Sequence, residues 1–340
     1  MTGITRLKLF IILKSSIMLL FALLFLVSCG GPGRDKAEGS SNNVLHIIHA
    51  GSLTYPVKVI SDAFREEHPE VEIRTEAWGS KAGARRVTDL ETPADLFLSA
   101  DYMVIVNMLI PEHASWYMSF AANEMSVVYT TKSAFADQIS WQNWHEILLR
   151  PGVESGRSNP DHDPCGVRTI FTAKLAEKHY ELPGLADQLL EKSGKNIRPK
   201  ETDLIALLES GHLDYIFLYK SVAKQHKLQY VELPPEINLG QPTLNKWYSQ
   251  VHTESLGNRP GETIIETGKA MEYGLTIPKK SSNPVLAASF VEFVMKKEKG
   301  QRIFDSLGQP PLAPAPSQYY DHIPVSLKKY ARENKPGQLD

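Results

Sequence analysis

Cysteine is scarce in this sequence: only two of the 340 residues are cysteines, Cys29 and Cys165. This scarcity excludes a framework of disulfides, and neither a paired Cys-x-x-Cys nor a His-Glu-x-x-His zinc motif occurs. An excess of one charge is missing as well, since 37 Lys and Arg face 39 Asp and Glu for a net charge of −2. Without a basic surplus, the composition does not indicate a nucleic-acid-binding protein.

A basic start and a short apolar run mark the N-terminus. Residues 17–27 are apolar throughout, and Arg6, Lys8 and Lys14 precede them. Eleven residues are too few to cross about 30 Å of hydrocarbon as a helix, so the run does not predict a membrane span. Basic residues, a short apolar core and small residues behind it are typical of a secretory signal peptide.

The end of this segment allows two interpretations. Leu26-Val27-Ser28-Cys29 resembles the lipobox of bacterial lipoproteins, which implies cleavage before Cys29 and a lipid on its sulfur. An ordinary signal peptide with an incidental cysteine is the alternative. On the lipobox interpretation, residues 1–28 are a lipoprotein signal peptide and residues 29–43, rich in Gly and Ser, are a flexible tether. Cys165 is then left alone, so we expect the mature protein to lie outside the cytoplasmic membrane without disulfides.

Short apolar strands alternate with helical patterns along the rest of the chain. The predicted strands are residues 45–50, 71–76, 94–99, 125–130, 213–219 and 273–277. The predicted helices are residues 56–67, a segment after Ser80, and residues 102–109, 141–149, 167–175, 201–210, 221–227, 285–297 and 301–306. This repetition of strand, turn and helix predicts an α/β fold with a mostly parallel sheet and helices on its faces.

One polar stretch, residues 158–166, is crowded with side chains that can do chemistry. It runs into a helical pattern, with Asp163 where an N-cap belongs and Pro164 as the first helical residue. The free N–H groups that follow, beginning with that of Cys165, favour an anion at the helix start. The carboxylate of Asp163 is therefore either a structural cap or a ligand.

Three other polar residues lie at helix starts: Ser52, Ser80 and Glu201. In an open α/β sheet, ligands bind outside the carboxyl ends of the strands, where such turns gather. Hydroxyl and backbone N–H groups that converge on one cleft suit a small oxyanion, and helix dipoles can balance its charge without Lys or Arg. The plainer alternatives are N-capping by the two serines and a helix-dipole contact by Glu201.

Several motifs together resemble those of the tungstate/molybdate-binding lipoproteins, which are substrate-binding proteins of ABC importers. The resemblance covers about residues 44–316. It rests on the sequences His49-Ala50-Gly51-Ser52-Leu53, Ala77-Trp78-Gly79-Ser80, Asp95-Leu96-Phe97-Leu98-Ser99-Ala100-Asp101-Tyr102, Ser158-Asn159-Pro160, Asp163-Pro164-Cys165-Gly166, Leu213-Asp214-Tyr215-Ile216-Phe217-Leu218-Tyr219, Glu232-Leu233-Pro234-Pro235-Glu236 and Gly308-Gln309-Pro310-Pro311.

The resemblance implies a two-lobed periplasmic-binding-protein fold of type II, with a central cleft and two hinge crossings. We expect lobe 1 to comprise residues 44–122 and 278–320, lobe 2 to comprise residues 123–277, and residues 321–340 to be a C-terminal tail. The crossings are expected near residues 120–125 and 275–280.

The resemblance also implies a ligand site. The residues expected to contact the ligand through hydrogen bonds are Gly51, Ser52, Ser80, Pro164, Cys165 and Tyr219. Asp163 and Glu201 are expected to bind the metal atom of the oxyanion directly. A carboxylate facing an oxyanion is repelled, but as a ligand of tungsten or molybdenum it raises the four-coordinate metal towards six. Sulfur(VI) does not readily expand in this way, so the pair would select against sulfate.

The function that follows from the resemblance is capture of tungstate or molybdate and delivery to an ABC permease with a separate ATPase. The protein is expected to be a lipid-anchored extracytoplasmic monomer without cofactor or catalysis. One alternative is a sulfate- or phosphate-binding transport protein. A more distant one is a metal-dependent hydrolase using Asp161, His162, Asp163 and Cys165.

Overall fold

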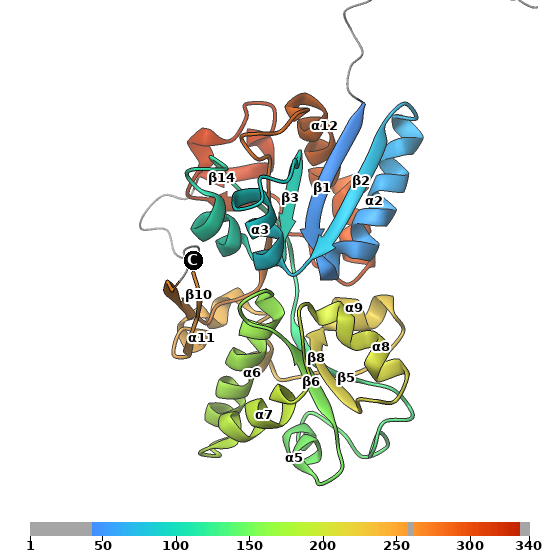
Figure 1. Cartoon of the computed structure of the whole chain (residues 1–340), viewed down its shortest axis with the longest axis vertical. Coiled ribbons are helices and arrows are strands. Elements are labelled where there is room, and N and C mark those ends of the chain that lie inside the picture. Colours follow the sequence, from blue (N-terminus) through green and yellow to red (C-terminus); the bar gives the residue numbers. More distant parts are fainter. Residues whose placement is uncertain (1–42, 258–260, 334–340) are drawn as a thin grey trace, which may run out of the picture. The chain divides into compact units, whose positions relative to one another are not determined.

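The computed structural model describes residues 43–257 and 261–333, which build two five-stranded sheets (Figure 1). The predicted signal peptide, Cys29 and nearly all of the predicted tether lie outside the described residues. The first sheet has the order β2-β1-β3-β12-β4, with strands β1 (Val44–Ala50), β2 (Glu72–Trp78), β3 (Leu96–Ser99), β4 (Met118–Ala122) and β12 (Glu272–Thr276). The second has the order β7-β6-β8-β5-β9, with strands β5 (Met125–Tyr129), β6 (Ser155–Ser158), β7 (Ile197–Arg198), β8 (Tyr215–Tyr219) and β9 (Gln229–Val231). Each sheet with the helices packed on it is called a lobe below.

In each sheet four of the five strands run in the same direction, so both sheets are mostly parallel, as predicted, with one antiparallel strand each. β1 pairs in parallel with β2 and β3, and β6 pairs in parallel with β7 and β8. β12 and β5 run antiparallel to both of their neighbours. These two antiparallel strands are the ones that the chain enters directly after crossing from the other lobe. No crossover helix precedes them, and such a helix is what a parallel neighbour requires.

Helices cover both faces of the first sheet. The helices on this lobe are α2 (Thr54–Glu67), α3 (Ser80–Thr88), α4 (Tyr102–Val104) continued by the π-helical turn η2 (Ile105–Leu109), α12 (Pro284–Met295), the π-helical turn η5 (Lys297–Gln301) and α13 (Arg302–Ser306). Alternate side chains of β1 point to opposite faces, so Ile47 packs in the core with Phe64 of α2, while Ile48 packs in the core that α3 covers. Phe64 in turn contacts Phe290 of α12, with 5.1 Å between the ring centroids.

The second sheet lies between two further groups of helices (Figure 1). Those elements are α5 (Trp144–Leu149), α6 (Pro164–Tyr180), α7 (Leu185–Gly194), η3 (Glu201–Leu204), α8 (Ile205–Glu209), α9 (Lys220–Gln225), α10 (Pro235–Asn238), η4 (Pro242–Leu244), α11 (Asn245–Tyr248) and the hairpin β10 (His252–Leu256)–β11 (Thr263–Thr267). The sequence patterns did not predict α7, the hairpin, β4 or β6. Among the described residues, no helix is long and apolar enough to cross a membrane.

The chain passes from the first sheet to the second at residues 123–124 and returns before Glu272. The expected first hinge crossing, near residues 120–125, stays a prediction. The second lies earlier than the expected boundary after residue 277, because β12 pairs with β3 and β4 of the first sheet. The expected tail also differs in its described part: β14 (Ala331–Glu333) pairs with β13 (Ala315–Ser317). The division into lobes at particular residues otherwise stays a prediction.

Candidate functional site

Asp163 joins two polypeptide segments at the start of α6. It is the N-cap of that helix, with Pro164 as the first helical residue, as predicted. Its Oδ1 accepts a hydrogen bond from the backbone N–H of Cys165 at 3.3 Å, and its Oδ2 accepts one from the N–H of Glu201 at 2.9 Å. The two carboxylate residues, 38 positions apart in the sequence, are therefore neighbours.

Glu201 is the first residue of η3, and its side chain faces the other lobe. The residue is only 1% exposed, and in the described part of the chain its carboxylate meets no N–H or hydroxyl donor from another residue, although the carboxyl group of Asp163 lies within hydrogen-bonding reach. A β-carbon placed on Gly51, in η1 (Gly51–Leu53) of lobe 1, would lie 3.3 Å from both carboxylate oxygens. A buried carboxyl group that faces a second carboxyl group instead of an N–H or hydroxyl donor is rare in folded proteins and calls for a specific explanation. A helix-dipole contact at the surface does not supply one.

The two carboxyl groups disfavour each other's ionisation. Burial raises the pKa of Glu201 well above its usual range, and the negative charge of Asp163 raises it further. Burial also raises the pKa of Asp163, although hydrogen bonds to its carboxylate act in the opposite direction. The pair therefore needs a positive centre between or beside its oxygens if both groups are to stay ionised at neutral pH.

Neither predicted serine caps its helix, so the capping interpretation of Ser52 and Ser80 is wrong. Ser52 lies within η1, and Ser80 is the first residue of α3 after Gly79; no side-chain cap bond forms in either case. The Oγ of Ser52 accepts a hydrogen bond from the hydroxyl of Tyr273 at 3.2 Å. The Oγ of Ser80 accepts one from the backbone N–H of Ala100 at 3.0 Å. Because the Oγ of each serine accepts this hydrogen bond through a lone pair, each hydroxyl still has its own proton to donate to a ligand.

Tyr219 ends β8 and is fully buried. Its hydroxyl accepts a hydrogen bond from Nη1 of Arg168 at 2.8 Å. The sequence patterns did not single out Arg168, yet a signal existed. It stands three residues before Phe171 and seven before Leu175, which places a cation on the apolar face of the helix. Tyr273 and Arg168 thus contact the predicted site residues although neither was predicted to do so.

Two of the four side chains required by the hydrolase alternative, those of Cys165 and Asp161, are unsuited to this chemistry or engaged elsewhere. Cys165 is fully buried, and burial raises the pKa of its thiol well above the usual range, with the nearby carboxylates adding to the effect. A thiol held protonated in this way is a poor nucleophile or metal ligand. The Oδ1 of Asp161 accepts a hydrogen bond from the N–H of Leu256 at 2.9 Å. Across residues 43–257 and 261–333, no three His, Cys, Asp or Glu side chains form a metal-binding group.

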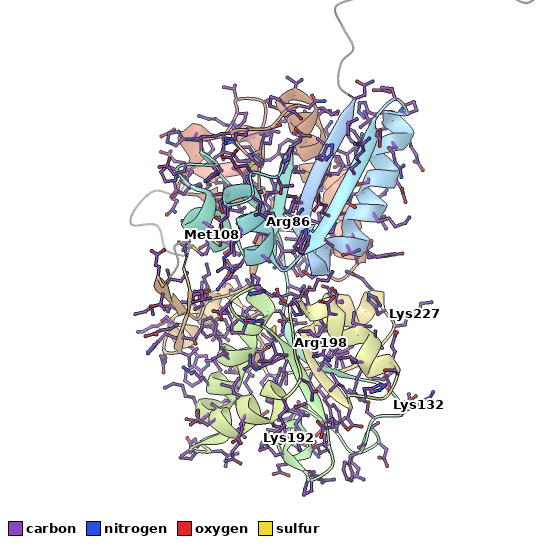
Figure 2. The ribbon with its side chains drawn as sticks, in the orientation of Figure 1. Arg86, Met108, Lys132, Lys192, Arg198 and Lys227 are labelled. Atoms are coloured by element: carbon purple, nitrogen blue, oxygen red, sulfur yellow. The ribbon has the colours of Figure 1, made fainter. Side chains whose placement is uncertain are left out.

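The two lobes meet directly beside the predicted site. The carbonyl of His162 accepts a hydrogen bond from the N–H of Ala82 in α3 at 3.1 Å. Lys81, only 3% exposed, donates to the carbonyl of Pro160 at 2.9 Å and also pairs with Glu266 of the hairpin. By contrast, exposed lysines such as Lys132 and Lys227 project from the outer surface (Figure 2). The lobes are therefore closed in this structure, and α3 of lobe 1 contacts the loop of lobe 2 that carries Asp163.

The predicted ligand residues therefore converge from both lobes. Lobe 1 supplies Gly51, Ser52 and Ser80, and lobe 2 supplies Asp163, Pro164, Cys165, Glu201 and Tyr219. The group combines hydroxyl and N–H donors with two carboxylates, which is an unusual mixture for binding an anion by hydrogen bonds alone.

Known proteins of similar sequence and fold exist. Residues 45–308 match the family described as bacterial extracellular solute-binding protein. A solute-binding protein of Petrotoga mobilis is 45% identical over 287 residues, which cover 84% of this chain and 89% of that protein. The molybdate/tungstate-binding protein WtpA of Pyrococcus abyssi is 37% identical over 336 residues, covering 90% of this chain and 95% of that protein.

The fold has a counterpart among solved structures. The periplasmic molybdate-binding protein of Azotobacter vinelandii matches with a TM-score of 0.57 at 16% identity, covering 78% of this chain and 98% of that chain. At this identity the likeness shows the fold alone. It confirms the prediction of an α/β periplasmic-binding-protein fold with two lobes.

Proposed function

Since this chain belongs to the family of bacterial extracellular solute-binding proteins, we propose that it captures tungstate or molybdate and delivers it to an ABC permease with a separate ATPase. Membership of this family confirms that the protein is a binding protein rather than an enzyme and that it works outside the cytoplasm. Three statements are proposals: that the ligand is tungstate or molybdate, that it is delivered to an ABC permease, and that Cys29 carries a lipid anchor.

The observation that carries the proposal is the pair of buried carboxyl groups. In the described residues, the Glu201 carboxylate meets the carboxyl group of Asp163 and no N–H or hydroxyl donor from another residue. The Glu201 N–H donates to Asp163 at 2.9 Å and holds the two side chains together. A carboxylate in such a place repels sulfate or phosphate. It is satisfied when its oxygen binds a hexavalent metal directly, so tungsten or molybdenum would accept one oxygen from each side chain. The name of the Pyrococcus abyssi relative supports the same ligands.

The remaining residues would bind the oxo groups. Ser52, Ser80 and Tyr219 each accept a hydrogen bond from a protein donor and keep a proton to donate. The backbone N–H of Gly51 lies at the N-terminal end of η1, whereas Pro164 has no N–H and that of Cys165 donates to Asp163, so a hydrogen bond from Cys165 to the ligand would require that bond to be given up. Phosphate could place one proton on one carboxylate, but it would leave the second carboxylate without a partner.

Competitive calorimetry tests the proposal on the purified protein. Tungstate and molybdate are expected to bind at least about a hundredfold more tightly than sulfate or phosphate, which corresponds to about 2.7 kcal/mol. Equal or tighter binding of sulfate or phosphate would show that the carboxyl pair does not bind a metal centre, and the sulfate- or phosphate-transport alternative would take its place.

The two serines give a smaller, separate prediction. Ser52→Ala and Ser80→Ala should each weaken tungstate binding by about 1–3 kcal/mol, the usual loss for a hydrogen bond to a charged group. Ser193→Ala is the matched control, because Ser193 is also buried but donates to the carbonyl of Leu189 within α7. Calorimetry on the three variants checks this. Wild-type affinity in both site variants would mean that the two hydroxyls do not contact the ligand.

The lipid anchor is tested independently of the ligand. Cys29→Ser should release the protein from the membrane and leave tungstate affinity unchanged, since Cys29 is not among the residues expected to bind the ligand. Detergent-phase partitioning of cells that express either form is the measurement. If the variant still partitions into detergent, the sequence around Cys29 is not a lipobox.

A further inference from the structure

We infer that Arg168 is a positioning residue of the oxyanion site, which fixes the hydroxyl of Tyr219 as a donor when the two lobes are closed. The inference rests on the proposed function, because it concerns how that site recognises its ligand. Arg168 itself need not touch the oxyanion. Its effect reaches the ligand mainly through the tyrosine, and to a smaller extent through the turn that follows β3.

The guanidinium of Arg168 is buried between the lobes. The residue lies on α6 of lobe 2 and is 3% exposed. Its Nη1 donates to the Tyr219 hydroxyl and to the carbonyl of Ala100, each at 2.8 Å, and its Nη2 lies 3.2 Å from the carboxylate of Asp101. Ala100 and Asp101 directly follow β3 of lobe 1, so these two contacts require the closed arrangement.

The direction of the bond to Tyr219 follows from chemistry. A guanidinium has five N–H donors, accepts nothing and stays protonated, so the phenol oxygen must be the acceptor. Burial raises the pKa of Tyr219 well above its usual range, which keeps the phenol protonated. Among the described residues, the Tyr219 hydroxyl donates to no protein acceptor, so its proton is available for an oxo group of the ligand.

The same arginine also holds the donor on the opposite lobe. The carbonyl of Ala100 accepts from Arg168, while the N–H of Ala100 donates to Ser80. The turn after β3 is therefore fixed from one side by Arg168, and it orients Ser80 on the other. Arg85 also crosses between the lobes, to the carbonyl of Asp161 at 2.8 Å, but it contacts neither hydroxyl. That difference makes Arg85 a suitable control.

A double-mutant cycle on tungstate affinity tests the inference. Arg168→Met should weaken binding about 30-fold in the wild-type background, but no more than about threefold when Tyr219→Phe has removed the hydroxyl. Arg85→Met should weaken binding by the same factor in both backgrounds, because Arg85 shares no partner with Tyr219. Thermal unfolding of each ligand-free variant checks that the fold is retained.

Each outcome decides the matter. If Arg168→Met weakens binding equally with and without the Tyr219 hydroxyl, Arg168 only holds the lobes together and the inference is wrong. Wild-type affinity in Arg168→Met overturns it too. If Arg168→Met fails to fold, the same cycle is run with Arg168→Lys. Lysine keeps the positive charge beside Asp101 but lacks the several N–H donors of the planar guanidinium. A wild-type protein that binds sulfate instead of tungstate refutes the proposed function, whereas a tungstate-binding wild type with an additive cycle refutes only the inference.

Discussion

Glu201→Gln and Asp163→Asn are expected to lower tungstate and molybdate affinity sharply while sulfate affinity holds or rises. Each amide lacks the negative charge that a ligand of a hexavalent metal supplies. Changing a residue that merely supports a metal ligand costs about 10–100-fold in affinity, so losing a ligand itself should cost about a hundredfold or more. For sulfate the substitution removes only repulsion. The opposite signs for the two kinds of anion separate a metal ligand from a structural cap.

Glu201→Gln should also change how far the two lobes close in the ligand-free protein. In the closed form, burial and the charge of Asp163 raise the pKa of Glu201, so closing around an ionised carboxylate costs free energy. This cost is absent below the ordinary carboxyl pKa of about 4.3 and grows as the pH rises towards the raised value. At neutral pH, ligand-free Glu201→Gln should therefore be more closed than wild type by small-angle X-ray scattering. The difference should disappear at acidic pH.

Two further measurements make the carboxylate prediction specific. X-ray absorption at the tungsten edge should show six oxygen neighbours in the wild-type complex, four from the oxyanion and one from each carboxylate, and fewer in the variants. Asp203→Asn is the matched control, since Asp203 lies in the same turn η3 but pairs with Lys200 near the surface. It should bind like wild type. A regular four-oxygen shell in the wild type would return Asp163 and Glu201 to structural roles.

The sequence predicted most of the elements around the first sheet and fewer of those in the second lobe. Strand β1 and helix α2 carry apolar residues at clear spacings, and the structure places them within a few residues of the expected bounds. Strand β6 was missed because Ser155–Ser158 contains no apolar residue. The hairpin β10–β11 was missed because its side chains are mostly exposed and show no buried face. Patterns of hydrophobicity cannot detect strands that are held by backbone pairing alone.

The site was predictable where local chemistry decides the geometry. Asp163 before Pro164 forms the expected N-cap, because that arrangement needs only neighbouring residues. The hydrogen bond from the Glu201 N–H to Asp163 joins residues 38 positions apart in the sequence, and no local sequence pattern predicts it. The contact of Tyr273 with Ser52 depends on β12 returning to the first sheet, whereas the expected boundaries assigned this strand to the other lobe. Long-range partners of this kind follow from topology, which the expected boundaries placed differently.

Gly79→Ala is expected to impair ligand capture without harming the fold of either lobe. Gly79 has φ −60° and ψ 136°, which any residue can adopt, so alanine introduces no local backbone strain. A β-carbon at this position would nevertheless lie 2.5 Å from the carbonyl oxygen of His162 in the other lobe. The carbonyl oxygen of His162 is a backbone atom, and the position of the new β-carbon is fixed by the backbone of Gly79. The lobes must therefore separate to relieve the contact. We expect a loss of about 1–3 kcal/mol in tungstate binding, the usual cost of overpacking a tight interface.

Calorimetry and small-angle scattering together distinguish this cause from a loss of stability. Ligand-free Gly79→Ala should unfold at the wild-type temperature or slightly above it, because alanine reduces the freedom of the unfolded chain. It should bind tungstate weakly and compact less than wild type when ligand is added. Gly194→Ala is the control, since its nearest neighbour, the guanidinium of Arg157, would lie 3.8 Å from the new carbon. If Gly79→Ala binds and compacts like wild type, the ligand-bound protein does not bring α3 against His162, and the loop that carries Asp163 must meet the oxyanion in another arrangement.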